Sequence, residues 1–158
     1  MSQSADYAGA VGLNFFEEDA LLKRVLKIRL PPGGRNAALK RLSILGGLCG
    51  GRLGRLIDAA HQDGRQPRLQ RYDLWGRRTD AIIYCGEQLE ARRLAFEQEC
   101  LPPQPLIERM TKAYLLNQNG EGGITCPLAM TDGLIELLQR EGTPAQKRRW
   151  LPLVNDPD

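Results

Sequence analysis

The chain has 158 residues, which suits one domain with a modest core, and its 42% apolar and 26% charged residues exclude a wholly disordered protein. Its apolar runs are only a few residues long, so none is a candidate membrane span, and the N-terminus lacks the pattern of a secretory signal. With 22 basic and 19 acidic residues, the net charge of +3 is too balanced to predict nucleic-acid binding.

The first half of the chain predicts two helices. Residues 1–14 are small and polar, and we expect them to be flexible. Asp19 suits the N-cap of a helix that the sequence PPGG at 31–34 ends. A second helix is predicted from about residue 36 to residue 60, because apolar residues recur at helical spacing: Leu42, Leu45, Cys49, Leu53, Leu56 and Ile57.

A row of glycines, Gly46, Gly50 and Gly54, removes side chains from one stripe of that second helix. A phosphate-binding loop is excluded, because Gly51 is followed by Arg52 and Leu53 rather than by lysine and serine or threonine. The row therefore predicts close packing against another helix.

The helical pattern breaks at residues 68–84, where a long ordered loop or a short hairpin is expected. Asp73 and Gly76 provide turn chemistry, and the β-branched residues that follow favour extended structure. Further helices are predicted over about 87–99 and 106–118, and in the latter one face is shared by Leu106, Met110, Ala113 and Tyr114. The loop that follows contains Glu121, which we interpret as a solvated residue rather than a catalytic base.

The C-terminal stretch has clear helix boundaries. Thr125 is predicted to cap a helix with Pro127 in its first turn, and that helix runs to Glu141. Gly142 ends it, and Thr143 with Pro144 begins a short basic helix. The predicted fold is all-α: a bundle of five or six helices, with a short extended or hairpin segment around 68–84.

Cysteine and histidine usage argues against a metal site. Cys49, Cys85, Cys100 and Cys126 lack zinc-site spacing, and His61 is the only histidine. Free thiols in a reducing cytoplasm are expected. The small arginine and lysine clusters are interpreted as a solvated, ion-paired surface, with an anion site as the alternative.

Two motifs together resemble a known family. The sequence EGTPAQKRRWLP resembles the element that closes the N-terminal helical domain of acyl-CoA dehydrogenases. The sequences RLQRYDLWGRRTD and CPLAMTDG resemble, in order and approximate spacing, the AidB-like (adaptive response) branch of that family. The resemblance covers roughly residues 14–153. One departure is YCGEQ, where that branch tends to have histidines, so no role of those histidines transfers to this chain.

The resemblance implies a domain over residues 15–153, followed by a tail at 154–158 where a β domain would begin. In the complete assembly it implies FAD, an acyl-CoA substrate and further domains that supply the flavin contacts and the catalytic glutamate. No catalytic residue or bound FAD is expected on this chain alone. The resemblance places one wall of the acyl and flavin cavity at Cys126, Pro127, Met130 and Thr131.

Other interpretations of these residues and of the chain stay open. Cys126 and Met130 could be ordinary core residues, and a nucleophilic pair of Cys126 with His61 is a remote alternative. The whole chain could be a free-standing, non-catalytic helical interaction protein derived from the same fold. A nucleic-acid partner is a weaker alternative, and homo-oligomerisation is expected.

Overall fold

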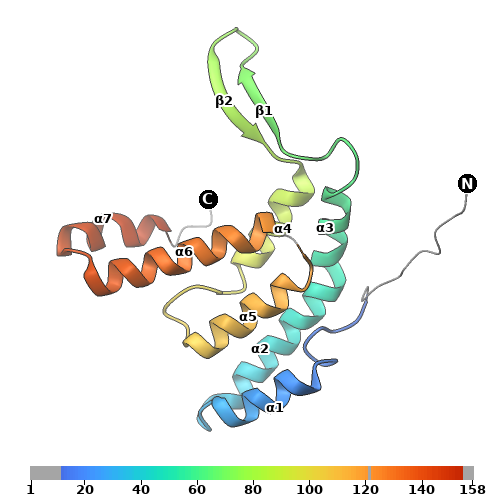
Figure 1. Ribbon diagram of the computed structural model, residues 1–158, viewed down its shortest axis with the longest axis vertical. Coiled ribbons are helices and arrows are strands. Elements are labelled where there is room, and N and C mark those ends of the chain that lie inside the picture. Colours follow the sequence, from blue (N-terminus) through green and yellow to red (C-terminus); the bar gives the residue numbers. More distant parts are fainter. Residues whose placement is uncertain (1–11, 121, 155–158) are drawn as a thin grey trace, which may run out of the picture.

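The computed structural model describes residues 12–120 and 122–154, and it consists of helices and one hairpin (Figure 1). The helices are α1 (Ala20–Arg29), α2 (Arg35–Leu48), α3 (Gly54–Ala60), α4 (Gly86–Phe96), α5 (Leu106–Asn117), α6 (Gly122–Glu141) and α7 (Pro144–Val154). A π-helical turn, η1 (Cys49–Leu53), joins α2 to α3 directly, so the described residues form six helical rods. The predicted all-α bundle of five or six helices is confirmed.

The core lies where the α2–α3 rod packs against α4 and α5. The predicted stripe of the second helix supplies much of it, since Leu42, Leu45, Cys49, Leu53 and Ile57 are all buried. Leu26 of α1 and Leu115 of α5 are fully buried in the same cluster. Among the described residues, no helix combines the length and apolar character needed to cross a membrane.

The glycine row is approached by an N-terminal segment, not by the helix that we predicted. A Cβ at Gly50 would overlap the carbonyl oxygen of Leu13, and a Cβ at Gly46 would overlap the backbone of Phe16. The amide of Gly12 donates a 2.7 Å hydrogen bond to the carbonyl of Gly50. Of the segment 1–14 that was expected to be flexible, residues 1–11 lie outside the described part of the chain, and residues 12–14 run along this rod. The prediction of a helix was wrong because a glycine stripe indicates only that some backbone comes close.

The hairpin pairs β1 (Arg68–Tyr72) with β2 (Arg78–Ile83) in antiparallel register. Its turn is held by Asp73, whose carboxylate accepts hydrogen bonds from the amides of Trp75 (2.8 Å) and Arg77 (2.9 Å). Gly76 has a φ of 75°, a conformation that glycine adopts readily. The segment expected to be extended is therefore a hairpin, and it projects from the helical body (Figure 1).

The two C-terminal helices form a projecting pair, in which α7 packs mainly on α6. The predicted start of α6 was wrong: the helix begins at Gly122, so Pro127 lies inside it and Thr125 is not its cap. The earlier start buries Ile124 in the core, which offsets the cost of an interior proline. The predicted start of α7 is confirmed by a capping box, in which Thr143 Oγ1 accepts from the Gln146 amide and Gln146 Oε1 accepts from the Thr143 amide.

Candidate functional site

Helix α6 turns its carboxylates toward α5. Arg109 of α5 is only 3% exposed, and its guanidinium pairs with Asp132 and, at 2.6 Å, with Glu136. Both acidic side chains in the middle of α6 thus pair with one buried cation on the core side, and Glu136 also pairs with the exposed Arg140 at 3.5 Å. Periodicity did not predict this arrangement, because the face of α5 that looked apolar, with Leu106, Met110 and Tyr114, is exposed.

The opposite side of α6 is exposed, and between Cys126 and Leu137 it carries no charged side chain. Met130 is 73% exposed, Leu137 59% and Leu134 43%, and Cys126 and Pro127 are exposed as well. Met130 and Cys126 are therefore not core residues within the described part of the chain, which removes the alternative that they are ordinary core. Such an exposed apolar stripe is typical of an interaction surface.

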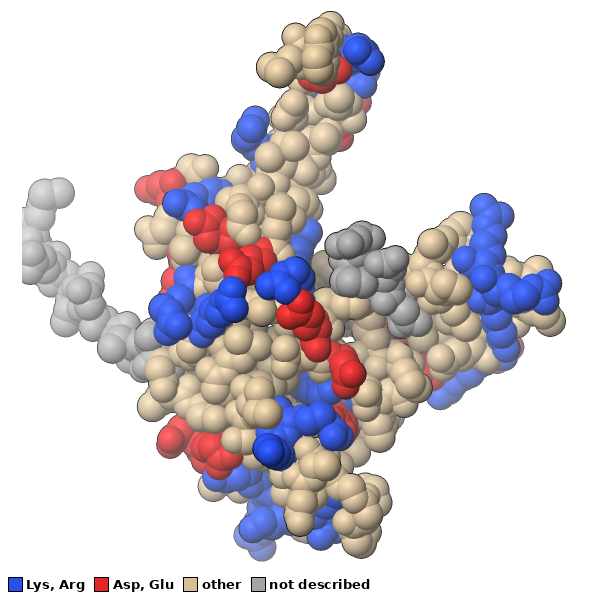
Figure 2. Space-filling view, turned by 180° about the vertical axis from the view of Figure 1, so that it is seen from behind, with Lys and Arg blue, Asp and Glu red and all other residues tan. Residues whose placement is uncertain are grey.

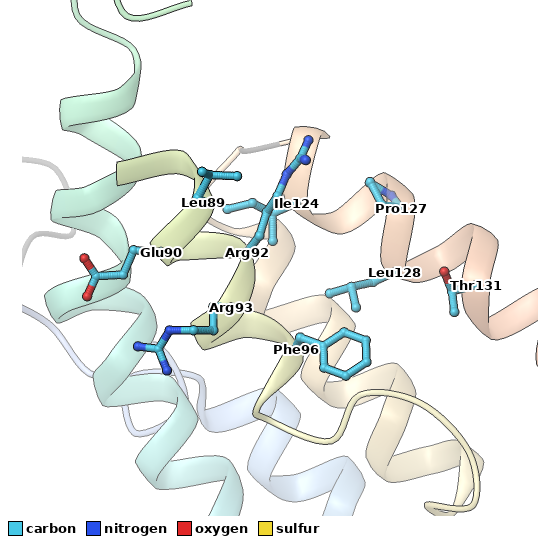
Figure 3. A pocket seen from close by; sticks show the side chains of 9 residues that line it. All are labelled: Leu89, Glu90, Arg92, Arg93, Phe96, Ile124, Pro127, Leu128 and Thr131. Carbon is cyan, nitrogen blue, oxygen red and sulfur yellow. The ribbon is translucent and has the colours of Figure 1, made fainter. Parts of the chain in front are cut away.

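A groove of about 680 Å³ lies between α4 and α6 (Figure 3). From α6 it is lined at helical spacing by Ile124, Pro127, Leu128 and Thr131. From α4, Leu89, Arg92 and Phe96 point toward α6, whereas Glu90 and Arg93 at the rim point toward the other side of the helix (Figure 3). Pro127 and Thr131 thus line this groove, and Cys126 and Met130 do not.

A smaller cavity of about 210 Å³ lies on the α5 side of α6. Its lining includes Met110 and Ala113 of α5 and Thr125 and Ala129 of α6, and the ion pair of Arg109 with Asp132 contributes charged groups. Sequence reasoning missed both cavities, because each is formed by residues from separate helices.

The four cysteines occupy different environments. Cys49 and Cys100 are buried, and burial raises the pKa of Cys49 to about 12 and that of Cys100 to about 11. Cys85 is half-buried, and Cys126 is exposed on α6. Nothing in the described structure makes a nucleophile of Cys126. The Nδ1 of His61, at the end of α3, lies 2.9 Å from the Ile57 carbonyl oxygen. Within the described ranges, no three potential metal-ligating side chains lie together.

Charged side chains alternate in sign over the helical body, whereas basic ones gather on the α6–α7 projection (Figure 2). On the body, arginines pair with carboxylates of α4, as in Arg52 of η1 with Glu90 and Arg65, in the loop after α3, with Glu87. Arg148 and Arg149 on α7 are exposed. The predicted ion-paired surface thus describes the body better than it describes α7.

Comparison with known proteins gives consistent results. Residues 7–158 match the family described as the adaptive response protein AidB N-terminal domain. Acyl-CoA dehydrogenase family member 11 of Caenorhabditis elegans is 28% identical over 139 residues, covering 79% of this chain and 21% of that protein.

Two solved structures share the fold. The apo form of Bd2924 matches 92% of this chain and 30% of its own length, with 27% identity and a TM-score of 0.81. The Caenorhabditis elegans ACDH-11 structure in complex with C11-CoA matches 99% of this chain and 29% of its own length, with 23% identity and a TM-score of 0.75. The chain thus spans under a third of the length of these relatives, and it belongs to the AidB N-terminal domain family, an acyl-CoA dehydrogenase-like helical domain.

Proposed function

We propose that the outward side of α6 is one wall of an acyl-CoA and flavin cavity, and that the other domains of an AidB-like acyl-CoA dehydrogenase flavoprotein complete it. The wall residues are Cys126 and Met130, which are exposed, together with Pro127 and Thr131, which also line the groove between α4 and α6. The observation that carries the proposal is the separation of charge along the middle of α6: Asp132 and Glu136 pair with Arg109 on the core side, and the outward residues Met130, Leu134 and Leu137 are apolar and exposed.

The residues present fit such a role. A thiol, a proline ring, a thioether and a hydroxyl offer an uncharged surface that suits an alkyl chain or the edge of a flavin ring, neither of which tolerates an unpaired buried charge beside it. The flavin, when bound, would accept the hydride from the β-carbon of the acyl group. The side chains of this chain would hold and orient the acyl chain and exclude water from it.

The similarity to relatives several times longer supports the proposal that this domain supplies a cavity wall while other domains supply the rest of the site. In the proposal, the catalytic carboxylate and the flavin contacts come from domains beyond these residues, so the 158-residue chain alone is inactive and retains no FAD. Residues 15–153 form the domain, and the assembly is cytoplasmic.

Cysteine protection tests the proposal. The chain would be mixed with a flavin-loaded polypeptide that carries the β domain and the C-terminal helical domain of a family member, and then treated briefly with a maleimide. We expect Cys126 to become at least tenfold less reactive in the mixture, while Cys85 serves as the internal control and keeps its rate.

Two outcomes would contradict the proposal. If Cys126 stays equally reactive although the two polypeptides form a complex, α6 is not at their interface. If the chain forms no such complex but binds a different protein through α6, the chain is instead a non-catalytic helical interaction protein. A flavin absorbance at near-stoichiometric occupancy on the purified chain alone would refute the assignment of the flavin contacts to other domains.

A further inference from the structure

The two most exposed large apolar side chains among the described residues are neighbours in the turn of the hairpin. Leu74 is 95% exposed and Trp75 is 76% exposed. Leu69 and Ile82 are exposed as well, but they are register partners at the base of the strands. The strands pack mainly on each other, so the turn stands clear of the helical body (Figure 1). Leu74 and Trp75 therefore add nothing to the core, and such side chains indicate a contact outside the domain.

The turn is ordered by its own hydrogen bonds. The Asp73 carboxylate accepts from the amides of Trp75 (2.8 Å) and Arg77 (2.9 Å), which is a common way for aspartate to stabilise a turn. This carboxylate is only 23% exposed. The guanidinium carbon of Arg77 lies 5.4 Å from the centre of the Trp75 ring. The acidic group is thus used within the turn, and Leu74 and Trp75 are presented without the entropy cost of ordering a flexible loop.

The charged side chains beside the turn are mainly cationic. Arg77 lies 3.7 Å from Asp73, and Arg78 lies 2.5 Å from Asp80. Arg71, on β1, has no carboxylate within ion-pair distance among the described residues. The hairpin as a whole has four arginines and two aspartates, and basic side chains are visible at the end of the projection (Figure 2). The turn therefore combines exposed apolar side chains with a net positive charge.

A lipid surface fits this turn better than a second protein does. Leu74, Trp75 and the exposed Tyr72, directly before the turn, offer on the order of 500 Å² of side-chain surface, less than the ~800 Å² that each partner contributes to a typical specific protein interface. A bilayer needs no complementary shape. Tryptophan and tyrosine are enriched at its interface, and an anionic leaflet attracts arginine.

We propose that the turn of the hairpin binds the surface of an anionic lipid bilayer. Leu74 and Trp75 insert at the level of the headgroups and the first acyl carbons. Arg71, Arg77 and Arg78 pair with the anionic headgroups. Attachment is reversible, because one small apolar anchor and a few cations act together and salt screens the cations. None of these residues belongs to the α6 wall, so the inference does not rest on the proposed function.

Co-sedimentation with vesicles tests the proposal. Phosphatidylcholine vesicles with about one third phosphatidylserine provide the anionic surface, and pure phosphatidylcholine vesicles provide the neutral one. We expect the wild-type chain to bind the anionic vesicles at least tenfold more tightly than the neutral ones. Leu74→Ser should weaken binding to the anionic vesicles at least tenfold, because the aliphatic anchor is lost. Leu21→Ser is the matched control: it makes the same change at a leucine 73% exposed on α1, and its binding should stay within twofold of wild type.

A second pair of variants tests the charge. Arg71→Gln should weaken binding to the anionic vesicles about fivefold, because one arginine near the lipid surface is lost. Arg24→Gln removes the same charge from an exposed position on α1 and should bind within twofold of wild type. Circular dichroism should show the same helix content for all four variants.

The two tryptophans of the chain identify the element that contacts lipid, since Trp75 lies in the hairpin and Trp150 on the basic helix α7. Measured in Trp150→Phe, the fluorescence of Trp75 should shift to shorter wavelength on anionic vesicles and be quenched by brominated lipid. Measured in Trp75→Phe, the fluorescence of Trp150 should not change.

Four results would overturn the proposal. These are no binding to anionic vesicles, equal binding to the two kinds of vesicle, equal binding by Leu74→Ser and wild type, and a lipid response of Trp150 in place of Trp75. A second copy of the chain as the true partner would give self-association without lipid that Leu74→Ser abolishes and Leu21→Ser does not, together with no binding to vesicles.

Discussion

The carboxylate of Glu108 accepts two hydrogen bonds from the guanidinium of Arg41, each 2.8 Å long, although the two residues are 67 positions apart. Glu108 is 2% exposed, and Lys112, one helical turn later, lies 3.4 Å from the same carboxylate. Lys112 in turn donates to the backbone carbonyls of Gln98 (2.7 Å) and Glu99 (3.1 Å). This network joins α2, α5 and the segment after α4, so α5 can bury a charged face.

Replacing Arg41 with alanine should lower the free energy of unfolding by about 1–2 kcal/mol, because a buried carboxylate loses two charge-assisted hydrogen bonds and retains only Lys112. Part of the loss is recovered, since Arg41 is half-exposed and water can replace it. Urea denaturation gives the comparison. The control is Arg93→Ala, which breaks an exposed pair with Glu97 and should cost no more than about 0.5 kcal/mol. Equal effects of the two substitutions would show that the network adds no stability.

Acid should remove the stability that the pair of Arg41 with Glu108 contributes. The hydrogen bond from Arg41, aided by the charge of Lys112 and opposed by desolvation, holds the pKa of Glu108 below its ordinary value of 4.5. A carboxylate with a lowered folded-state pKa contributes stability that is complete above the unfolded value and is lost as the pH falls through the folded value. The stability difference between wild type and Arg41→Ala should therefore be constant above about pH 5 and shrink below pH 4.5. A difference that stays constant into stronger acid would contradict this.

The N-terminal segment gives a prediction about Gly50. Alanine at this position should cost about 2 kcal/mol or more, because its Cβ cannot coexist with the carbonyl of Leu13 and the hydrogen bond from Gly12 to Gly50 would be displaced. Gly133→Ala on α6 is the control, since nothing lies within 4 Å of its Cβ position. That control should stabilise the chain by up to about 1 kcal/mol through helix propensity. Thermal unfolding of both variants measures their stability relative to wild type. A Gly50→Ala variant as stable as wild type would contradict the prediction.

Capping and turn residues predicted where helices and turns lie better than they predicted which segments pack together. Capping residues such as Asp19 and Thr143, and the turn residue Asp73, act within a few positions of themselves, so the sequence alone identified them. The glycine row predicted a close approach but not which backbone would make it. The start of α6 was misplaced because burial of Ile124 depends on the rest of the fold.

In the candidate site, too, the helix was predicted from the sequence, but its orientation depends on tertiary packing. The resemblance selected α6, and its residues Cys126 and Met130 do lie on an exposed side. The orientation of that side depends on the pairing of Asp132 with Arg109, which is 23 residues earlier in the chain. It also depends on α5, which buries Arg109 and leaves Met110 and Tyr114 exposed. Apolar periodicity predicts that α5 buries its apolar face instead, so the sequence alone could not have shown the orientation of α6. The groove around Arg92 likewise requires α4 and α6 to be placed together.

Thiol reactivity should divide the cysteines into two classes. Cys126 is exposed and Cys85 half-buried, whereas Cys49 and Cys100 are buried and have pKa values raised to about 12 and about 11, so almost no thiolate is present at neutral pH. Under native reducing conditions, Cys126 should react first with a maleimide, then Cys85, and the other two only on the timescale of unfolding. Denatured chain should titrate four thiols. Rapid modification of Cys49 or Cys100 in the native chain would show that the core opens locally.

The outward side of α6 should drive association. Its exposed stripe of Met130, Leu134 and Leu137 is apolar, and covering such surface is favourable by roughly 25 cal/mol per Å². We expect the wild-type chain to self-associate at high concentration, and Met130→Glu to weaken that association at least tenfold with unchanged helix content. Gln139→Glu is the matched control, because it adds the same charge to an exposed position on the other side of α6 by helical periodicity. Sedimentation velocity over a concentration series measures all three chains. A wild-type chain that stays monomeric at several hundred micromolar, or two variants that associate equally, would show that this stripe is not a self-association surface.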